Sequence, residues 1–171
     1  MNKIIIKVFF FFNLLIFSSF SSLAETFVYS GGCFWCTEAD TEKLKGVNEV
    51  ISGFTAGTTK DPKYIPGQWG DHREAALVKY NPKIISFKEL VVHVFKTIDY
   101  EDNNGQFCDR GRSYSPAIYY KTNEERLIIS SLSTIIQLSI LPPSPKPCDL
   151  IYSTSFISPK VRAFETKFLK L

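Results

Sequence analysis

A cysteine-containing turn between a strand and a helix constrains this chain more than any other feature. The string Gly-Gly-Cys-Phe-Trp-Cys occupies residues 31–36, after an alternating segment over 26–30 that predicts a strand and before a segment over 37–45 with helical spacing. The two glycines let the backbone turn sharply and leave room beside Cys33. The turn places the Cys33 thiol at a helix N-terminus, where unpaired N–H groups and the helix dipole favour an anion. We therefore expect Cys33 to have a lowered pKa and to be partly ionised at neutral pH.

Two aromatic residues follow this cysteine. Phe34 and Trp35 supply apolar walls that fit a small, methyl-like group, and a thiolate beside such a pocket is a nucleophile. From spacing alone, Cys33 and Cys36 are also compatible with two small core residues on one helical turn, or with half of a metal site. The flanking glycines and aromatic residues favour chemistry.

The first 24 residues have the pattern of a secretory signal peptide. Two lysines and an apolar run over 8–20 precede the small residues Ser-Leu-Ala at 22–24, where a signal peptidase would cleave. The apolar run is short for a transmembrane span, and an uncleaved anchor is the alternative. We expect residues 25–171 to form one secreted or periplasmic domain, a monomer that does not contact a membrane after cleavage.

The charge and cysteine content narrow the function further. Cleavage lowers the formal net charge from +3 to +1 because it removes Lys3 and Lys7, and the interspersed charges that remain argue against a nucleic-acid partner. All four cysteines lie after the expected signal peptide, in a compartment where disulfides persist. A domain of this length does not need a disulfide to fold, so redox chemistry competes with a stabilising bridge. The four are Cys33, Cys36, Cys108 and Cys148.

Hydrophobic periodicity predicts the order β-α-β-β-α-β-α. Beyond the first strand and helix, the expected elements are strands over 47–54, 74–80 and 114–120, a helix over 87–98 capped by Ser86, and a helix over 124–141 capped by Asn123. This is the split β-α-β order of an α+β fold. It predicts a ferredoxin-like α/β plait, with a mainly antiparallel sheet, helices on one face and long active-site loops at one edge.

Four separated motifs occur together in this chain. They are GCFWC at 32–36, SGF at 52–54, DHRE at 71–74 and CDRGRSY at 108–114. In this order and at these separations the chain resembles the A-type peptide-methionine (S)-S-oxide reductases, over about residues 27–126. The resemblance implies reduction of the S epimer of methionine sulfoxide, free or in oxidised proteins, which repairs oxidative damage. It implies no metal and no bound cofactor, and an external thiol reductant such as thioredoxin as electron donor.

The resemblance implies catalytic roles for four residues. Cys33 would attack the sulfoxide sulfur, and Glu74 matches the general acid that protonates the departing oxygen, a task for which burial must raise its pKa. Asp109 and Tyr114 match positions that hold the sulfoxide oxygen or a water molecule by hydrogen bonds. Without the resemblance, Glu74 would be interpreted as an exposed glutamate at a strand end, Asp109 as a loop cap and Tyr114 as a half-buried strand tyrosine.

Three residues match substrate-binding positions. Phe34 and Trp35 match the walls around the substrate methyl group, and Phe54 stands where the family usually has tyrosine. The missing hydroxyl predicts one lost hydrogen bond to the sulfoxide oxygen and a weakened activity, which Phe54→Tyr should raise. The tail from about residue 127 departs further, because the family's Tyr-His-Gln segment has no clear counterpart there.

A second thiol must convert the Cys33 sulfenic acid into a disulfide that a thioredoxin-like donor can reduce. Cys36 is closest in sequence, Cys108 precedes Asp109, and Cys148 lies in the tail, where the family often carries its resolving cysteine. We expect Cys148 or Cys108 rather than Cys36 to be the resolving cysteine.

Three other functions fit parts of the pattern. A thioredoxin-like disulfide oxidoreductase would use the Cys-x-x-Cys motif without Glu74. A zinc-binding or other binding module would use the four cysteines, but Cys108 and Cys148 lack the close spacing of a zinc knuckle. A degenerate reductase that has lost its activity with its tail is the third.

Overall fold

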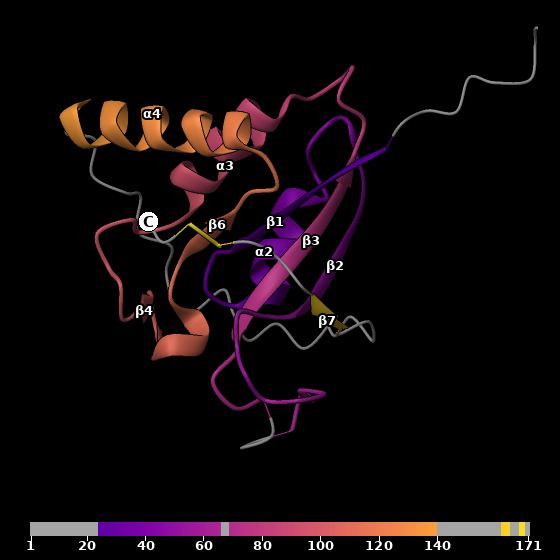
Figure 1. Cartoon of the computed structure of the whole chain (residues 1–171), viewed down its shortest axis with the longest axis vertical. Coiled ribbons are helices and arrows are strands. Elements are labelled where there is room, and N and C mark those ends of the chain that lie inside the picture. The colour runs from indigo at the N-terminus through magenta and orange to yellow at the C-terminus, as the bar shows by residue number, and fades with distance from the viewer. Residues whose placement is uncertain (1–23, 66–68, 140–161, 165–167, 170–171) are drawn as a thin grey trace, which may run out of the picture.

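A computed structural model of the protein describes residues 24–65, 69–139, 162–164 and 168–169 (Figure 1). The expected signal peptide, apart from Ala24, and the resolving candidate Cys148 lie outside these described residues. Within the described ranges, no helix combines the length and apolar character needed to cross a membrane.

Four antiparallel strands form the centre of the sheet, in the order β2-β3-β1-β6. The strands are β1 (Glu25–Ser30), β2 (Val47–Thr55), β3 (Arg73–Tyr80) and β6 (Ala117–Tyr119). Two short strands extend the sheet: β7 (Arg162–Phe164) pairs in parallel with β2, and β8 (Phe168–Leu169) pairs antiparallel with β6. The predicted α+β class with a mainly antiparallel sheet is confirmed.

Strand β6 is shorter than the predicted strand over 114–120. Residues Arg112–Tyr114 form a 3₁₀ turn, η1, and Pro116 follows it. Because proline has no N–H to donate to a neighbouring strand, the ladder begins only at Ala117. The predicted loop over 99–112 also contains a short hairpin of β4 (Gly105–Gln106) and β5 (Asp109–Arg110).

The helices are α2 (Phe34–Thr41), α3 (Phe87–Thr97) and α4 (Asn123–Ser139). Helices α3 and α4 begin and end within two residues of their expected positions, whereas α2 begins three residues and ends four residues earlier than the helix predicted over 37–45. As predicted, Ser86 caps α3, in a reciprocal capping box with Glu89. The predicted cap of α4 is wrong by one residue, because Glu125 N–H donates to Thr122 Oγ1 at 3.2 Å and Thr122 N–H donates to the Glu125 carboxylate at 3.3 Å.

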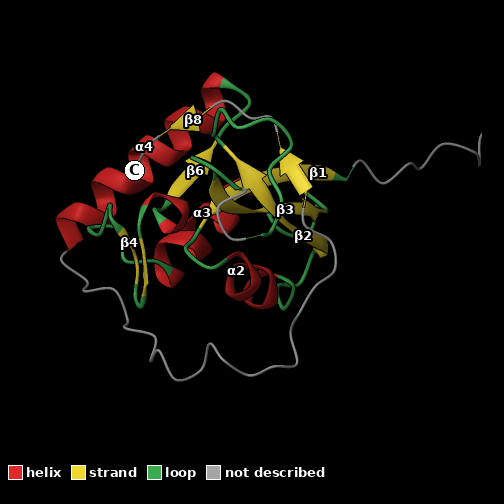
Figure 2. Cartoon of the chain, turned by 90° about the horizontal axis from the view of Figure 1, so that it is seen from below, coloured by secondary structure: helices red, strands yellow, loops and turns green. Residues whose placement is uncertain are grey.

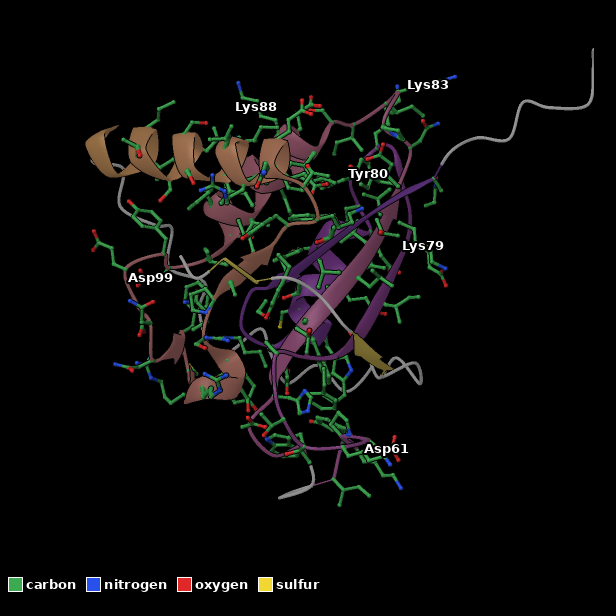
Figure 3. The ribbon with its side chains drawn as sticks, viewed as in Figure 1. Asp61, Lys79, Tyr80, Lys83, Lys88 and Asp99 are labelled. Carbon is green, nitrogen blue, oxygen red and sulfur yellow. The ribbon has the colours of Figure 1, made fainter. Side chains whose placement is uncertain are left out.

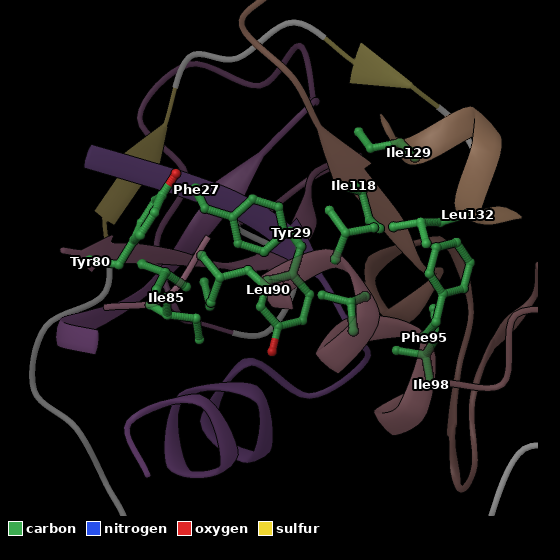
Figure 4. Close-up of a cluster of buried hydrophobic side chains, with 14 of the residues drawn as sticks. Phe27, Tyr29, Tyr80, Ile85, Leu90, Phe95, Ile98, Ile118, Ile129 and Leu132 are labelled. Carbon is green, nitrogen blue, oxygen red and sulfur yellow. The ribbon is translucent and has the colours of Figure 1, made fainter. Parts of the chain in front are cut away.

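The main core lies between one face of the sheet and the helices α3 and α4 (Figure 4). Phe27 and Tyr29 from β1 are 1% exposed, and Leu90 from α3 and Ile129 from α4 pack in the same cluster. Figure 2 shows α2 and α3 on the same side of the sheet. Burying one such large apolar side chain contributes about 1.5–3 kcal/mol, so this cluster fixes the helices on the sheet.

One end of the sheet collects three connections. These are the turn from β1 into α2, the loop over 56–72 between β2 and β3, and the segment over 98–116 before β6. Asp61 marks the loop over 56–72 in Figure 3, at the opposite end of the molecule from Lys83. The predicted site residues come from these three connections and from the strand ends beside them.

Candidate active site

Cys33 is the residue immediately before helix α2. Its carbonyl accepts the backbone N–H of Thr37 at 3.1 Å and the Thr37 hydroxyl at 3.0 Å, so the first turn of the helix closes on it. Gly32 precedes it with φ +91°, and a Cβ at Gly32 would lie 2.7 Å from the Cβ of Gln106. Only glycine fits this backbone and this close approach.

Glu74 lies at the same helix terminus. The backbone N–H of Phe34 donates to Glu74 Oε2 at 3.0 Å, and the Glu74 residue is only 4% exposed. Burial raises the pKa of Glu74 to about 8; the Phe34 N–H opposes this rise, and the charges of Cys33 and Asp109 add to it. The carboxyl group is therefore mainly protonated at neutral pH and can act as an acid.

The prediction of a lowered Cys33 pKa is wrong for this state. A hydrogen bond with the Cys36 thiol and burial raise the pKa of Cys33, and they outweigh the N–H groups of Cys36 and Trp35, which act in the opposite direction. The N–H of Phe34, another donor of the same turn, is occupied by Glu74. Neither Cys33 nor Cys36 is in a disulfide.

Asp109 and Tyr114 reach this site from the segment over 98–116. Hairpin strand β5 carries Asp109, and η1 carries Tyr114. Burial raises the pKa of both, and the charges of Glu74, Asp109 and Cys33 raise that of Tyr114 further. Since such charge effects decline with distance, they indicate that Asp109 and Tyr114 lie in the neighbourhood of Glu74 and Cys33.

Phe34 and Trp35 lie side by side at the start of α2, with ring centroids 5.3 Å apart. Phe34 is 1% exposed, whereas Trp35 is partly exposed. The indole Nε1 of Trp35 is buried without a hydrogen-bond partner in the structure. The pair thus forms an apolar wall that contains one unused donor.

Phe54 packs against the aromatic wall. It is completely buried, opposite Glu74 in the β2–β3 register, and its ring packs against Phe34 (5.6 Å) and His72 (6.5 Å). The ring therefore supports Phe34, and the contact of Phe54 with substrate that the resemblance implies stays a prediction.

Sequence reasoning missed Tyr64, from the loop over 56–72. Its ring centroid lies 4.9 Å from that of Trp35 and 5.6 Å from that of Phe34. Burial raises the pKa of Tyr64, and so do the charges of Glu74, Cys33 and Asp109. The only signal in the sequence was an aromatic residue in a polar loop between two matched motifs.

Side-chain hydrogen bonds close the loop that carries Tyr64. The Asp71 carboxylate accepts the backbone N–H and hydroxyl groups of Thr58 and Thr59, and these bonds lower its pKa. His72 Nε2 lies 2.8 Å from the Thr59 carbonyl, and Arg112 donates to the carbonyls of Asp71 and Ala56. The loop is thereby tied to β3 and to η1.

The other two candidates for the resolving cysteine were Cys108 and Cys148. Cys108 is disulfide-bonded, whereas Cys148 lies beyond the described residues. In the part of the chain that the structure describes, no group of three or more His, Cys, Asp or Glu residues is arranged to hold a metal ion.

Comparisons with known proteins match most of this chain. A family model described as peptide methionine sulfoxide reductase matches residues 25–144. Peptide methionine sulfoxide reductase MsrA of Bacillus velezensis is 33% identical over 138 residues, which cover 80% of this chain and 78% of that protein. MsrA 2 of Rhizobium meliloti is 46% identical over 92 residues, 54% of this chain and 46% of that protein. The chain thus spans about half or less of the length of several relatives, including 26% of MsrA/MsrB of Vibrio cholerae.

Solved structures share the fold. Methionine sulfoxide reductase A of Corynebacterium diphtheriae superposes with a TM-score of 0.60 at 24% identity, covering 81% of this chain and 70% of that one. Mxr1 of Saccharomyces cerevisiae in reduced form also gives 0.60, at 20% identity, with coverages of 85% and 77%.

Proposed function

This chain belongs to the peptide methionine sulfoxide reductase family, and from that premise we propose that it reduces the S epimer of methionine sulfoxide, free or in proteins, to methionine. One observation carries the proposal. Cys33 and the buried Glu74 carboxyl lie at one helix terminus, where the N–H of Phe34, the residue after Cys33, donates to Glu74 and burial raises the pKa of Glu74 to about 8. A nucleophile and an acid within one partly apolar site suit transfer of oxygen from sulfur to sulfur.

The chemical step balances as an oxygen transfer. Cys33 Sγ bonds to the positively polarised sulfoxide sulfur while Glu74 protonates the sulfoxide oxygen. The sulfur–oxygen bond of the substrate then breaks, and the oxygen leaves as water with the protons of Glu74 and of the Cys33 thiol. A water molecule next attacks the Cys33 sulfur and breaks the new sulfur–sulfur bond, which releases methionine, leaves a Cys33 sulfenic acid and returns a proton to Glu74. The sulfoxide gains two electrons and the cysteine sulfur loses two.

The surrounding side chains supply binding. Phe34, Trp35 and Tyr64 form the apolar wall against which the substrate methyl group packs. Asp109 and Tyr114 hold the sulfoxide oxygen or a water molecule, as their shared charge environment with Glu74 supports.

Cys36 is the resolving cysteine of this proposal, in place of the expected Cys148 or Cys108. The hydrogen bond between the Cys33 and Cys36 thiols supports it, as does the disulfide that already engages Cys108. The Cys36 sulfur attacks the sulfenic sulfur of Cys33 and displaces its hydroxyl group, which leaves as water with the proton of the Cys36 thiol, and a disulfide forms. An external dithiol, such as a thioredoxin-like protein, then reduces this disulfide.

Three further parts of the proposal rest on the sequence pattern and the strand order. Residues 1–24 act as a cleaved signal peptide, and the mature protein is a secreted or periplasmic monomer. Sequencing the N-terminus of the exported protein tests the cleavage after Ala24. The third part concerns the fold: the strand order β2-β3-β1-β6 supports a ferredoxin-like α/β plait with its helices on one face and its catalytic loops at one end.

The test of function is an assay of methionine production from each sulfoxide epimer with a dithiol donor. Wild-type protein is expected to reduce the S epimer and to leave the R epimer unchanged, and Cys33→Ser is expected to abolish turnover. Equal reduction of both epimers, or full turnover by Cys33→Ser, would overturn the proposal. A disulfide substrate in the same assay tests the thioredoxin-like alternative, which predicts disulfide exchange without sulfoxide reduction.

A further inference from the structure

The side chain of Tyr64 is held by rings from two parts of the chain. At the start of α2 it meets Trp35 and Phe34, with centroids 4.9 and 5.6 Å away. In its own loop it stacks on Trp69, with centroids 5.9 Å apart and 21° between the ring planes. Tyr64 is nevertheless 47% exposed, so its position depends on these ring contacts more than on burial.

We propose that Trp69 is a positioning residue for substrate binding, which acts through Tyr64 by holding the tyrosine ring against the pocket wall. This inference rests on the proposed function, because Tyr64 would be part of the wall that meets the substrate. Among the described residues, Trp69 has a ring contact with Tyr64 but none with Trp35 or Phe34. Among these ring contacts, the Trp69 side chain reaches the wall through Tyr64.

The backbone around Trp69 is fixed independently of substrate. Its carbonyl accepts the backbone N–H of His72 at 3.2 Å. The next residue, Gly70, has φ +58° and packs closely on Thr59, which the Asp71 carboxylate also holds. Trp69 therefore offers a stable platform at the β3 end of the loop.

Tyr64 lies near the groups of the proposed reaction. Its ring contacts Trp35 and Phe34, the residues that follow Cys33, and burial raises its pKa, as do the charges of Glu74, Cys33 and Asp109. Rotation of its ring would therefore change the apolar wall. Loss of the stack would leave Tyr64 with contacts on the α2 side alone.

Steady-state kinetics of Trp69→Ala and Trp69→Phe test the inference. An aromatic pair of this kind contributes enough that Trp69→Ala should lower kcat/KM about two- to tenfold, through KM rather than kcat. Trp69→Phe retains a stacking ring and should restore most of the loss. Ile65→Ala is the matched control, since Ile65 is 45% exposed in the same loop and should leave kcat/KM unchanged.

A double variant separates positioning from general support of the fold. If Trp69 acts through Tyr64, Tyr64→Ala with Trp69→Ala should be no worse than Tyr64→Ala alone. Additive losses, or a Trp69→Ala variant with wild-type KM in an active enzyme, would overturn the inference.

One measurement does not depend on activity. In protein with ¹³C-labelled tyrosine, the ring signal of Tyr64, assigned with Tyr64→Phe, should shift to the position of an exposed tyrosine in Trp69→Ala. An unchanged signal would overturn the inference even in a wild type that lacks reductase activity. A shifted signal together with an inactive wild type would retain the positioning contact and reject the proposed function.

Discussion

The backbone N–H of Phe34 donates a hydrogen bond to the carboxyl group of Glu74 at 3.0 Å, across 40 positions of sequence. This bond joins the first residue of α2 to β3, and it places the acid of the proposed reaction beside Cys33. Because the same bond withdraws one helix-terminal donor from Cys33, acid and nucleophile are coupled in this state.

Glu74→Gln should reduce kcat/KM for S-methionine sulfoxide by about 100-fold or more, since a positioned general acid contributes at least that factor. Glutamine is close in size and still accepts the Phe34 N–H, so the fold should be kept. Glu101→Gln, on an exposed residue, is the matched control. Methionine release measured by chromatography decides this, and near-normal turnover by Glu74→Gln would remove the acid role.

The free energy of unfolding should fall as pH rises from about 4.5 towards 8. The folded protein raises the pKa of Glu74 from 4.5 to about 8, so it binds more protons than the unfolded chain in this window. The stabilising contribution is complete below pH 4.5 and is lost as pH passes 8. Urea unfolding at several pH values in this range should show that the free energy of unfolding changes less with pH for Glu74→Gln than for wild type. The raised pKa of Asp109 has an effect of the same sign, but Asp109 is present in both proteins. An equal change of stability with pH in the two proteins would therefore contradict the raised pKa of Glu74.

Cys36→Ser should permit one round of methionine formation and then leave Cys33 as a sulfenic acid. The sulfenic acid would be trapped by dimedone and detected by mass spectrometry, whereas wild type would yield a Cys33–Cys36 disulfide. Cys108→Ser serves as the comparison and should still form that disulfide. A wild-type disulfide that joins Cys33 to Cys108 or Cys148 would show that the resolving thiol lies elsewhere.

Phe54→Tyr distinguishes the faster turnover that the family resemblance predicts from the loss of stability that the burial of Phe54 predicts. The resemblance predicts faster turnover, but the ring is fully buried between Phe34 and His72, and a hydroxyl left unpaired there costs about 1–3 kcal/mol. We expect lower thermal stability and no gain in kcat. A clear gain would mean that the phenol reaches the sulfoxide oxygen.

Thr122→Ala should destabilise the protein by about 0.5–2 kcal/mol, the usual effect of losing a helix cap. Thr122 accepts the Glu125 N–H at 3.2 Å, whereas Asn123 is already the first residue of α4. Asn123→Ala is therefore the control and should change the free energy of unfolding by a few tenths of a kcal/mol. Equal losses in the two variants would favour the cap first expected from the sequence.

Much of the fold follows from local pattern. The alternation in β1, β2 and β3 and the Ser86 capping box are carried by neighbouring residues, so they could be predicted. The shortened β6 could also have been expected, because Pro116 is visible in the sequence.

The site was less predictable because its properties arise from contacts between distant segments. The Cys33 pKa depends on burial and on the Cys36 thiol, which outweigh the helix terminus considered alone. The burial of Phe54 depends on α2 covering β2, and Tyr64 enters the site only through the folding of its loop. The matched motifs predicted roles for Glu74, Asp109 and Tyr114, but they carried no information about these contacts.

The close approach of Gly32 to Gln106 links the two halves of the active centre. Gln106 is 2% exposed, and its side-chain amide is fixed by the backbone of Asp99 through bonds of 2.6 and 2.8 Å, so it has no room to retreat. A single methyl group at position 32 would therefore clash with Gln106 and displace β4, whose partner strand β5 bears Asp109, relative to Cys33. The lack of a side chain at residue 32 thus allows the β4–β5 hairpin to approach Cys33 closely.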